Sequence, residues 1–182
     1  MESLTTFTFE SAKILSTTLL SRDLASVKYT TSTVRKGSSR QSTSLVGAPG
    51  SPDTEIDWKR NTFTISGETR HVGELRKKRA TFSSSRYWSW FDCEEYRVKY
   101  DSELENTWTV SSYSGTVLAT FSSNIHRVFH GNSLPALNLS SSIHDEDERR
   151  FIILVLLYSE IKRLESLRAV AIDFIGRRNV GL

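Results

Sequence analysis

The sequence predicts a mainly β domain that surrounds one buried helix, and three observations support this. Segments in which apolar and polar residues alternate recur through the first 140 positions, as in an antiparallel sheet. Serine and threonine make up about a quarter of the 182 residues, a composition that leans toward strands. Residues 151–158 are apolar at every position, so a helix there has no face for water. We therefore expect a closed antiparallel β-barrel around a C-terminal α-helix, with residues 1–182 forming a single domain.

The expected strands are short and are bounded by turn residues. Residues 54–58 and 62–65 alternate on either side of a turn at 59–61, which predicts a hairpin. The same reasoning gives further strands at 27–31, 80–82, 87–91, 95–100, 107–110, 116–121 and 137–139.

Residues 37–53 interrupt this pattern. They contain five serines, three glycines and two of the three prolines, a composition that buries little apolar surface. Because too few residues precede this segment to fold alone, we expect a long flexible loop inside the domain.

The C-terminal third has the features of a helix over about 145–165. Asp145 is suited to cap its N-terminus, with Glu148 at the spacing of a capping box, while Lys162 and Arg163 suit its far end. A buried parallel strand is the alternative, but the absence of glycine and proline between 145 and 175 favours a helix. Its central residues, expected to fill the lumen, are Phe151, Ile152, Ile153, Leu154, Val155, Leu156, Leu157 and Tyr158.

Residues 166–182 form a C-terminal extension with an apolar stripe that is suited to a partner or to self-association. This segment either continues the central helix to about 175 or folds back as a second helix, with Gly176 as the expected stop. The stripe consists of Leu167, Ala171, Phe174 and Ile175.

The N-terminal sequence lacks the basic residue and the apolar run of a signal peptide. The longest apolar run of the chain, residues 151–158, is far short of the roughly 20 residues that span a bilayer. A single cysteine, Cys93, excludes an internal disulfide framework and suits a reducing compartment. We expect a cytoplasmic protein, with peripheral membrane association and a nuclear location both left open.

The strongest functional indication is a basic segment. The formal net charge is +3, yet residues 70–86 carry +5 and the remaining chain −2. A charge so localised argues against a dedicated nucleic-acid binder and suits a loop that holds an anionic lipid surface or a phosphate group. A merely solvated loop and a nuclear-localisation signal are the alternatives. The bases concerned are Arg70, Arg76, Lys77, Lys78, Arg79 and Arg86.

Little in the sequence favours catalysis or metal binding. His126 and His130 lie four apart but lack the glutamate of a zinc-protease motif, and acidic neighbours raise the thiol pKa of Cys93. His144 beside Asp145 has no serine or cysteine nucleophile that can be placed against it. We expect no catalytic residues, no metal and no cofactor. The clustered tryptophans and tyrosines suit either a ligand pocket or the barrel wall and core.

An ordered set of motifs resembles a fungal family of small proteins, found in mushroom-forming species, that is known as a domain of unknown function. That family is related to the barrels of tubby-like proteins, LURP-one-related proteins and phospholipid scramblases. The resemblance covers Phe7 to Glu165 and excludes the run 76–79 and the tail from Ser166. Its motifs are Ile56-Asp57-Trp58, Phe63-Thr64-Ile65-Ser66-Gly67, Glu95-Tyr96-Arg97-Val98-Lys99, Val117-Leu118-Ala119-Thr120-Phe121, and Asp145 followed by Phe151-Ile152-Ile153-Leu154-Val155 and Glu160-Ile161-Lys162-Arg163.

The resemblance implies a tubby-like barrel threaded by its C-terminal helix, and it implies no activity. Tubby domains bind phosphoinositide headgroups through lysine and arginine, but no binding residue transfers to this chain. We expect a non-enzymatic binding module that recognises an anionic membrane or phosphoinositide headgroup through the basic segment. A protein-interaction scaffold is the alternative, and a small hydrolase is a distant third.

Overall fold

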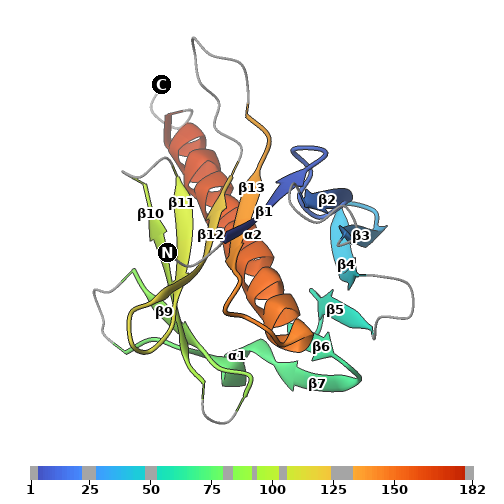
Figure 1. Cartoon of the computed structure of the whole chain (residues 1–182). Helices are drawn as coiled ribbons and strands as arrows, with labels where there is room; N and C mark the ends of the chain where they lie inside the picture. Colours follow the sequence, from blue (N-terminus) through green and yellow to red (C-terminus); the bar gives the residue numbers. More distant parts are fainter. Residues whose placement is uncertain are drawn as a thin grey trace.

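The structure is a computed structural model that describes residues 4–21, 28–47, 53–79, 84–91, 94–102, 106–123 and 133–178. A long helix, α2, lies along the concave side of a strongly curved antiparallel sheet (Figure 1). The elements are β1 (Leu4–Phe9), β2 (Thr17–Ser21), β3 (Lys28–Lys36), β4 (Ser39–Val46), β5 (Thr54–Asp57), β6 (Thr62–Ile65), β7 (Glu68–His71), α1 (Val72–Leu75), β8 (Arg76–Lys77), β9 (Arg86–Trp88), β10 (Tyr96–Asp101), β11 (Thr107–Ser111), β12 (Val117–Ser122), β13 (Ala136–Ser140) and α2 (Glu146–Arg178).

The 13 strands form one sheet in the order β7-β6-β5-β4-β3-β2-β1-β13-β12-β11-β10-β9-β8. Every neighbouring pair is antiparallel, and the first strand, β1, pairs with the last, β13, through Leu4–Ser140 to Thr8–Ala136. The mainly β fold with a C-terminal helix is therefore confirmed. The predicted hairpin is also confirmed, since β5 and β6 pair from Thr54–Ile65 to Asp57–Thr62. The strand expected at 80–82 lies outside the described residues.

Helix α2 provides the centre of the core. Each residue from Phe151 to Tyr158 is at most 3% exposed, so the sheet covers all sides of this stretch as the apolar run predicted. Aromatic side chains from the sheet pack directly on it: Trp58 stacks on Tyr158, and Trp90 and Tyr96 contact Phe151. The aromatic residues of these strands thus build the core.

The first turn of α2 is acidic, as its sequence predicted. The Asp145 carboxylate accepts a hydrogen bond from the Asp147 backbone N–H at 3.2 Å, which caps the helix. Glu148 points into the fold, where it accepts a hydrogen bond from the Tyr96 hydroxyl at 2.9 Å. Burial is the main cause that raises the pKa of Glu148, and the nearby carboxylate of Glu94 adds to it.

At its far end α2 continues as one helix beyond 165 to Arg178. The extension therefore prolongs the central helix and does not fold back. The stop expected at Gly176 is wrong, because the helix runs through this residue. In the described part of the chain, no helix is both long enough and apolar enough to cross a membrane.

Among the described residues, backbone hydrogen bonds do not close the predicted barrel, because the sheet has two edges, β7 and β8. The short helix α1 joins these edges, and it buries Val72 and Leu75 in the core instead of continuing a ladder. Side chains cross this gap: the Arg70 guanidinium donates to the Trp90 carbonyl oxygen and lies 5.1 Å from the centre of the Trp90 ring.

The flexible loop expected at 37–53 is wrong for about half of its length, because residues 39–46 form strand β4. A two-residue turn with Gly37 at φ 62° connects β3 to β4. Thr43 and Leu45 point into the core, and the Trp58 indole N–H donates to the Thr43 hydroxyl at 2.8 Å. A serine- and threonine-rich strand therefore holds its place through a few inward residues whose polar atoms are hydrogen-bonded. Residues 48–52 lie outside the described residues.

Candidate functional site

The structure does not bring the six predicted bases together. Arg70 is held at the gap between the sheet edges, where it also donates to the Glu68 carboxylate at 2.6 Å. Arg79 pairs with Glu95 at 2.5 Å and lies over the ring of Tyr87. Lys77 and Lys78 are exposed. These four side chains do not line the basic pocket that the remaining two, Arg76 and Arg86, help to form.

The run 76–79 was predicted as a loop, but Arg76 and Lys77 form the edge strand β8. Successive side chains of a strand point to opposite faces, which separates these two bases. Arg76 pairs with Trp88, whose side chain is 1% exposed, and the Arg76 guanidinium lies 5.9 Å from the Trp88 ring centre. Lys77 pairs with Tyr87 on the neighbouring register position. Both residues are exposed, and the strand geometry directs Arg76 toward the side on which the basic pocket lies.

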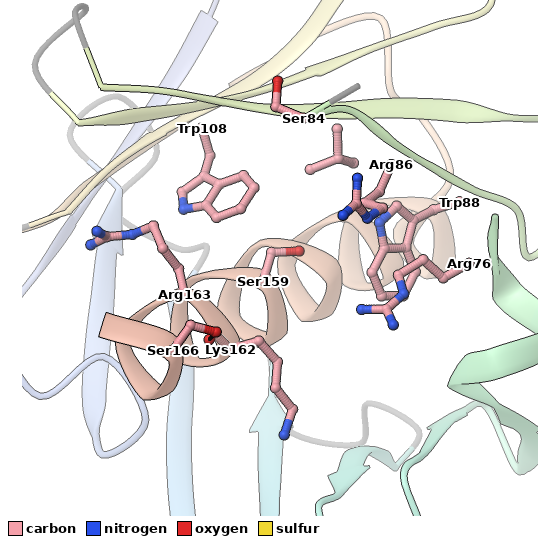
Figure 2. Close-up of a pocket in the computed structure, with 10 residues that line it drawn as sticks. Arg76, Ser84, Arg86, Trp88, Trp108, Ser159, Lys162, Arg163 and Ser166 are labelled. Carbon is pink, nitrogen blue, oxygen red and sulfur yellow. Dashed lines mark hydrogen bonds between the residues drawn. The ribbon is translucent and has the colours of Figure 1, made fainter. Parts of the chain in front are cut away.

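The basic pocket has a volume of about 190 Å³ and lies where α2 leaves the sheet (Figure 2). Arg76 and Arg86 line it from β8 and β9, and Lys162 and Arg163 line it from α2. In Figure 2 the charged ends of Lys162 and Arg163 point away from Arg76 and Arg86. The described part of its lining contains four cationic side chains and no carboxylate. These lining residues are Arg76, Ser84, Arg86, Trp88, Val98, Trp108, Ser159, Lys162, Arg163 and Ser166.

One of the four cations is already compensated. Arg163 donates two hydrogen bonds to Glu160, at 2.7 and 2.8 Å, and these bonds raise the pKa of Arg163 further. Glu160 is 2% exposed and also accepts the Trp108 indole N–H at 2.9 Å. A buried carboxylate with this many donors is satisfied, so Arg163 serves mainly to neutralise Glu160.

The other three cations have different neighbours. Lys162 contacts Glu165 at 3.0 Å, but both side chains are exposed to solvent, where such pairs are weak. Arg86 donates to the Ser85 carbonyl oxygen at 3.0 Å, which orients its guanidinium. Arg76 has the Trp88 ring as its neighbour. Arg76 and Lys162 are therefore the cations of the described lining that have no buried counter-charge.

The pocket also contains an unused donor. The indole nitrogen of Trp88 is buried and has no hydrogen-bond partner in the described structure. Figure 2 shows the Trp88 indole between the side chains of Arg76 and Arg86 at one wall of the pocket. An unpaired buried N–H costs about 1–3 kcal/mol, and a bound acceptor removes this cost.

This arrangement presents positive charge and N–H and O–H donors, which can bind an anion. The described part of the lining contains no imidazole and no carboxylate, and the Ser166 hydroxyl donates to the Lys162 carbonyl oxygen at 2.9 Å. Among the described residues, no three metal-ligating side chains gather in one place. Cys93, His126 and His130 lie outside the described residues, and His144 is an exposed residue just before α2.

Two of the four cationic side chains of the pocket were not predicted from the sequence as site residues. Lys162 and Arg163 were interpreted only as the basic end of a helix, yet they follow the buried run directly and so mark the place where α2 leaves the sheet. The end of an all-apolar helix stretch was the signal that could have located them.

Comparison of the chain with protein-family models, curated proteins and solved structures finds no match. The resemblance to the fungal family and to tubby-like barrels therefore stays a prediction that rests on the quoted motifs.

Proposed function

We propose that this protein is a non-enzymatic binding module whose basic pocket recognises a phosphate-bearing anionic group, with the headgroup of an anionic phospholipid such as a phosphoinositide as its source. The observation that carries this proposal is a hollow that Arg76, Arg86 and Lys162 all line and whose described lining has no carboxylate. Arginine offers the fork of donors that fits phosphate oxygens, and lysine adds a third charge. We also propose that the sheet around α2 is of the tubby-like class.

The pocket is better suited to this task than the whole run 76–79. Arg79 is paired with Glu95, and Lys77 lies on the other side of the edge strand, so neither adds directly to the pocket. Trp88 and Trp108 also line the pocket, and their apolar rings lower the local dielectric constant, which strengthens each contact between a cation and a phosphate group. Recognition thus depends on concavity and donors in addition to net charge.

Vesicle flotation with Arg76→Ala tests this function, and Lys77→Ala is a matched control that removes the same charge one residue away. Vesicles of phosphatidylcholine with and without a phosphoinositide are compared at rising salt. We expect binding of the wild-type protein only to the phosphoinositide vesicles, loss of most of it in Arg76→Ala, and little change in Lys77→Ala. An equal loss of vesicle binding in both variants would show that binding depends on general surface charge and not on the pocket. Absence of binding by the wild-type protein would refute the proposal.

Self-association through the extension of α2 is a second candidate function, favoured by its exposed apolar side chains. Leu167, Val170 and Ile172 are 54%, 69% and 71% exposed. Ala171 is exposed as well, while the side chains of Phe174 and Ile175 lie outside the described ones. Leu167 and Val170, three positions apart on this helix, share a face that suits a helix–helix contact. Sedimentation equilibrium of the full chain and of Leu167→Gln/Val170→Gln tests this: a wild-type protein that stays monomeric excludes it.

A further inference from the structure

A second basic hollow lies on the other side of Lys162, with a volume of about 470 Å³. The tip of the β3–β4 hairpin forms one wall and the exit of α2 forms the other. Lys162 lines this hollow as well as the basic pocket, so the two hollows meet at one side chain. The residues that line the second hollow are Arg35, Ser38, Ser39, Arg40, Trp58, Lys162, Glu165 and Arg168.

Two of its arginines face each other directly. The register of the hairpin pairs Arg35 with Arg40, across a turn whose Ser38 and Ser39 also line the hollow. Like charges opposite each other on neighbouring strands destabilise a hairpin, and an anion bound between them removes this repulsion. The hydroxyls of the two serines add donors for the same anion.

The single carboxylate of the hollow does not balance its cations. Glu165 accepts hydrogen bonds from Arg40 at 2.5 Å and from Lys162 at 3.0 Å. Arg35 and Arg168 have no ion pair among the described residues, which leaves a net charge of +3 over the lining residues. The Nε atom of Arg40 is buried and has no hydrogen-bond partner, while its guanidinium lies 5.6 Å from the Trp58 ring centre. The second hollow therefore combines a buried N–H donor that has no partner, Arg40 Nε, with an excess of positive charge, just as the basic pocket contains the unpaired indole N–H of Trp88.

We infer that the second hollow is an anion subsite and that the ligand carries two separate phosphate groups, one in each hollow, with Lys162 contacting both. This inference rests on the proposed function and deepens it, because it specifies the class of ligand as a polyphosphorylated one. A ligand with a single phosphate fills only one hollow. A ligand with two phosphates uses the cations of both, so the two contacts act as a linked pair.

Calorimetric titration of the full chain with inositol monophosphate and inositol bisphosphate tests the inference. We expect the bisphosphate to bind at least tenfold more tightly, as one additional charged contact provides. Arg35→Gln should lower affinity for the bisphosphate about tenfold and leave affinity for the monophosphate unchanged. Lys36→Gln is the matched control: it removes an exposed base next to Arg35 that does not line the hollow. Arg35→Gln also removes the repulsion with Arg40, so unfolding of this variant is not expected.

The outcomes separate the two proposals. Equal affinity for both inositol phosphates would overturn the second subsite, and so would equal effects of Arg35→Gln and Lys36→Gln. The basic pocket would still stand in either case if Arg76→Gln lowers the affinity for both ligands. If the wild-type protein binds neither inositol phosphate nor phosphoinositide vesicles, the proposed function fails and the subsite fails with it. Competition between soluble bisphosphate and vesicles then identifies the source: displacement supports a lipid headgroup, whereas tight soluble binding without vesicle binding supports a free polyphosphate and contradicts the lipid source.

Discussion

The two halves of α2 share one helical conformation but are held by different forces. In the half from Phe151 to Ile161, apolar side chains are buried against the sheet on every side. In the half from Lys162 onward, the described side chains are partly or fully exposed, and the contacts are ion pairs such as Lys162–Glu165. Packing therefore fixes the first half, while helix propensity and continuity with the first half support the second. The basic residues gather at the boundary between them.

The strongest test of this contrast places the same substitution in each half. Leu154 is 0% exposed, and Leu154→Asp buries a charge with no partner, which should cost more than about 4 kcal/mol and abolish folding. Val170 is 69% exposed, and Val170→Asp should change stability by no more than about 0.5 kcal/mol. Urea denaturation followed by circular dichroism measures both. A folded Leu154→Asp protein would show that the helix is not the centre of the core.

A second test concerns the last buried charge before the boundary. Glu160→Ala leaves the Arg163 guanidinium and the Trp108 indole N–H without their acceptor, which should cost about 2–3 kcal/mol. Glu160→Gln keeps an acceptor for Trp108 and should cost less. The free energy of unfolding in urea distinguishes the two variants. If Glu160→Ala leaves this free energy unchanged, the ion pair at the boundary between the two halves of α2 has no structural role.

The third test addresses binding at the boundary itself. Lys162 lines both hollows, so Lys162→Gln should weaken binding of inositol monophosphate and bisphosphate alike, by about tenfold. Its ion pair with Glu165 is exposed, so stability should change by less than about 0.5 kcal/mol. Lys78→Gln, at an exposed position that lines neither hollow, is the control. Calorimetry and urea denaturation of the same preparations separate binding from folding.

The smallest expected effect is a pH dependence. Burial by itself would raise the pKa of Glu165, but hydrogen bonds from Lys162 and Arg40 outweigh it and hold this pKa below its usual value of 4.5. A lowered folded-state pKa contributes stability above the usual value, and this contribution disappears as the pH falls through the folded-state pKa. Glu165→Gln should therefore be slightly less stable than the wild-type protein near about pH 7, and the difference should vanish as the pH falls through the lowered folded-state pKa of Glu165. A constant difference in urea midpoint would show that the pairs contribute nothing through charge.

The sequence predicts the parts of this fold that local patterns encode. The apolar run 151–158 and the acidic start at Asp145 locate α2, and alternation locates the hairpin of β5 and β6. Strand β4 was missed because its inward residues, Thr43 and Leu45, are too few to stand out among serines. The two edges of the sheet were missed because α1 spans only four residues, too short for a helical period.

The site was predicted only in part, since it depends on register and not on composition. The basic run singled out Arg76, yet nothing in a row of four bases distinguishes Arg76 from Lys77 until β8 pairs with β9. Lys162 joins Arg76 and Arg86 only because α2 lies inside the curved sheet. Arg35 and Arg40 were not singled out, because their segment was interpreted as a loop and its pairing was not considered.

The central position of β1 also has a consequence for how the chain folds as it is synthesised. β1 is joined to β13, with the Thr6 hydroxyl donating to the Asn138 side chain 132 positions away, and α2 follows β13. A nascent chain on the ribosome therefore exposes the inner face of most of its strands before the helix that covers them exists. Such distant pairing slows folding and lengthens the time during which unpaired strands can aggregate. We expect this protein to complete its fold only after its C-terminal helix has left the ribosome, and to depend on chaperones until then.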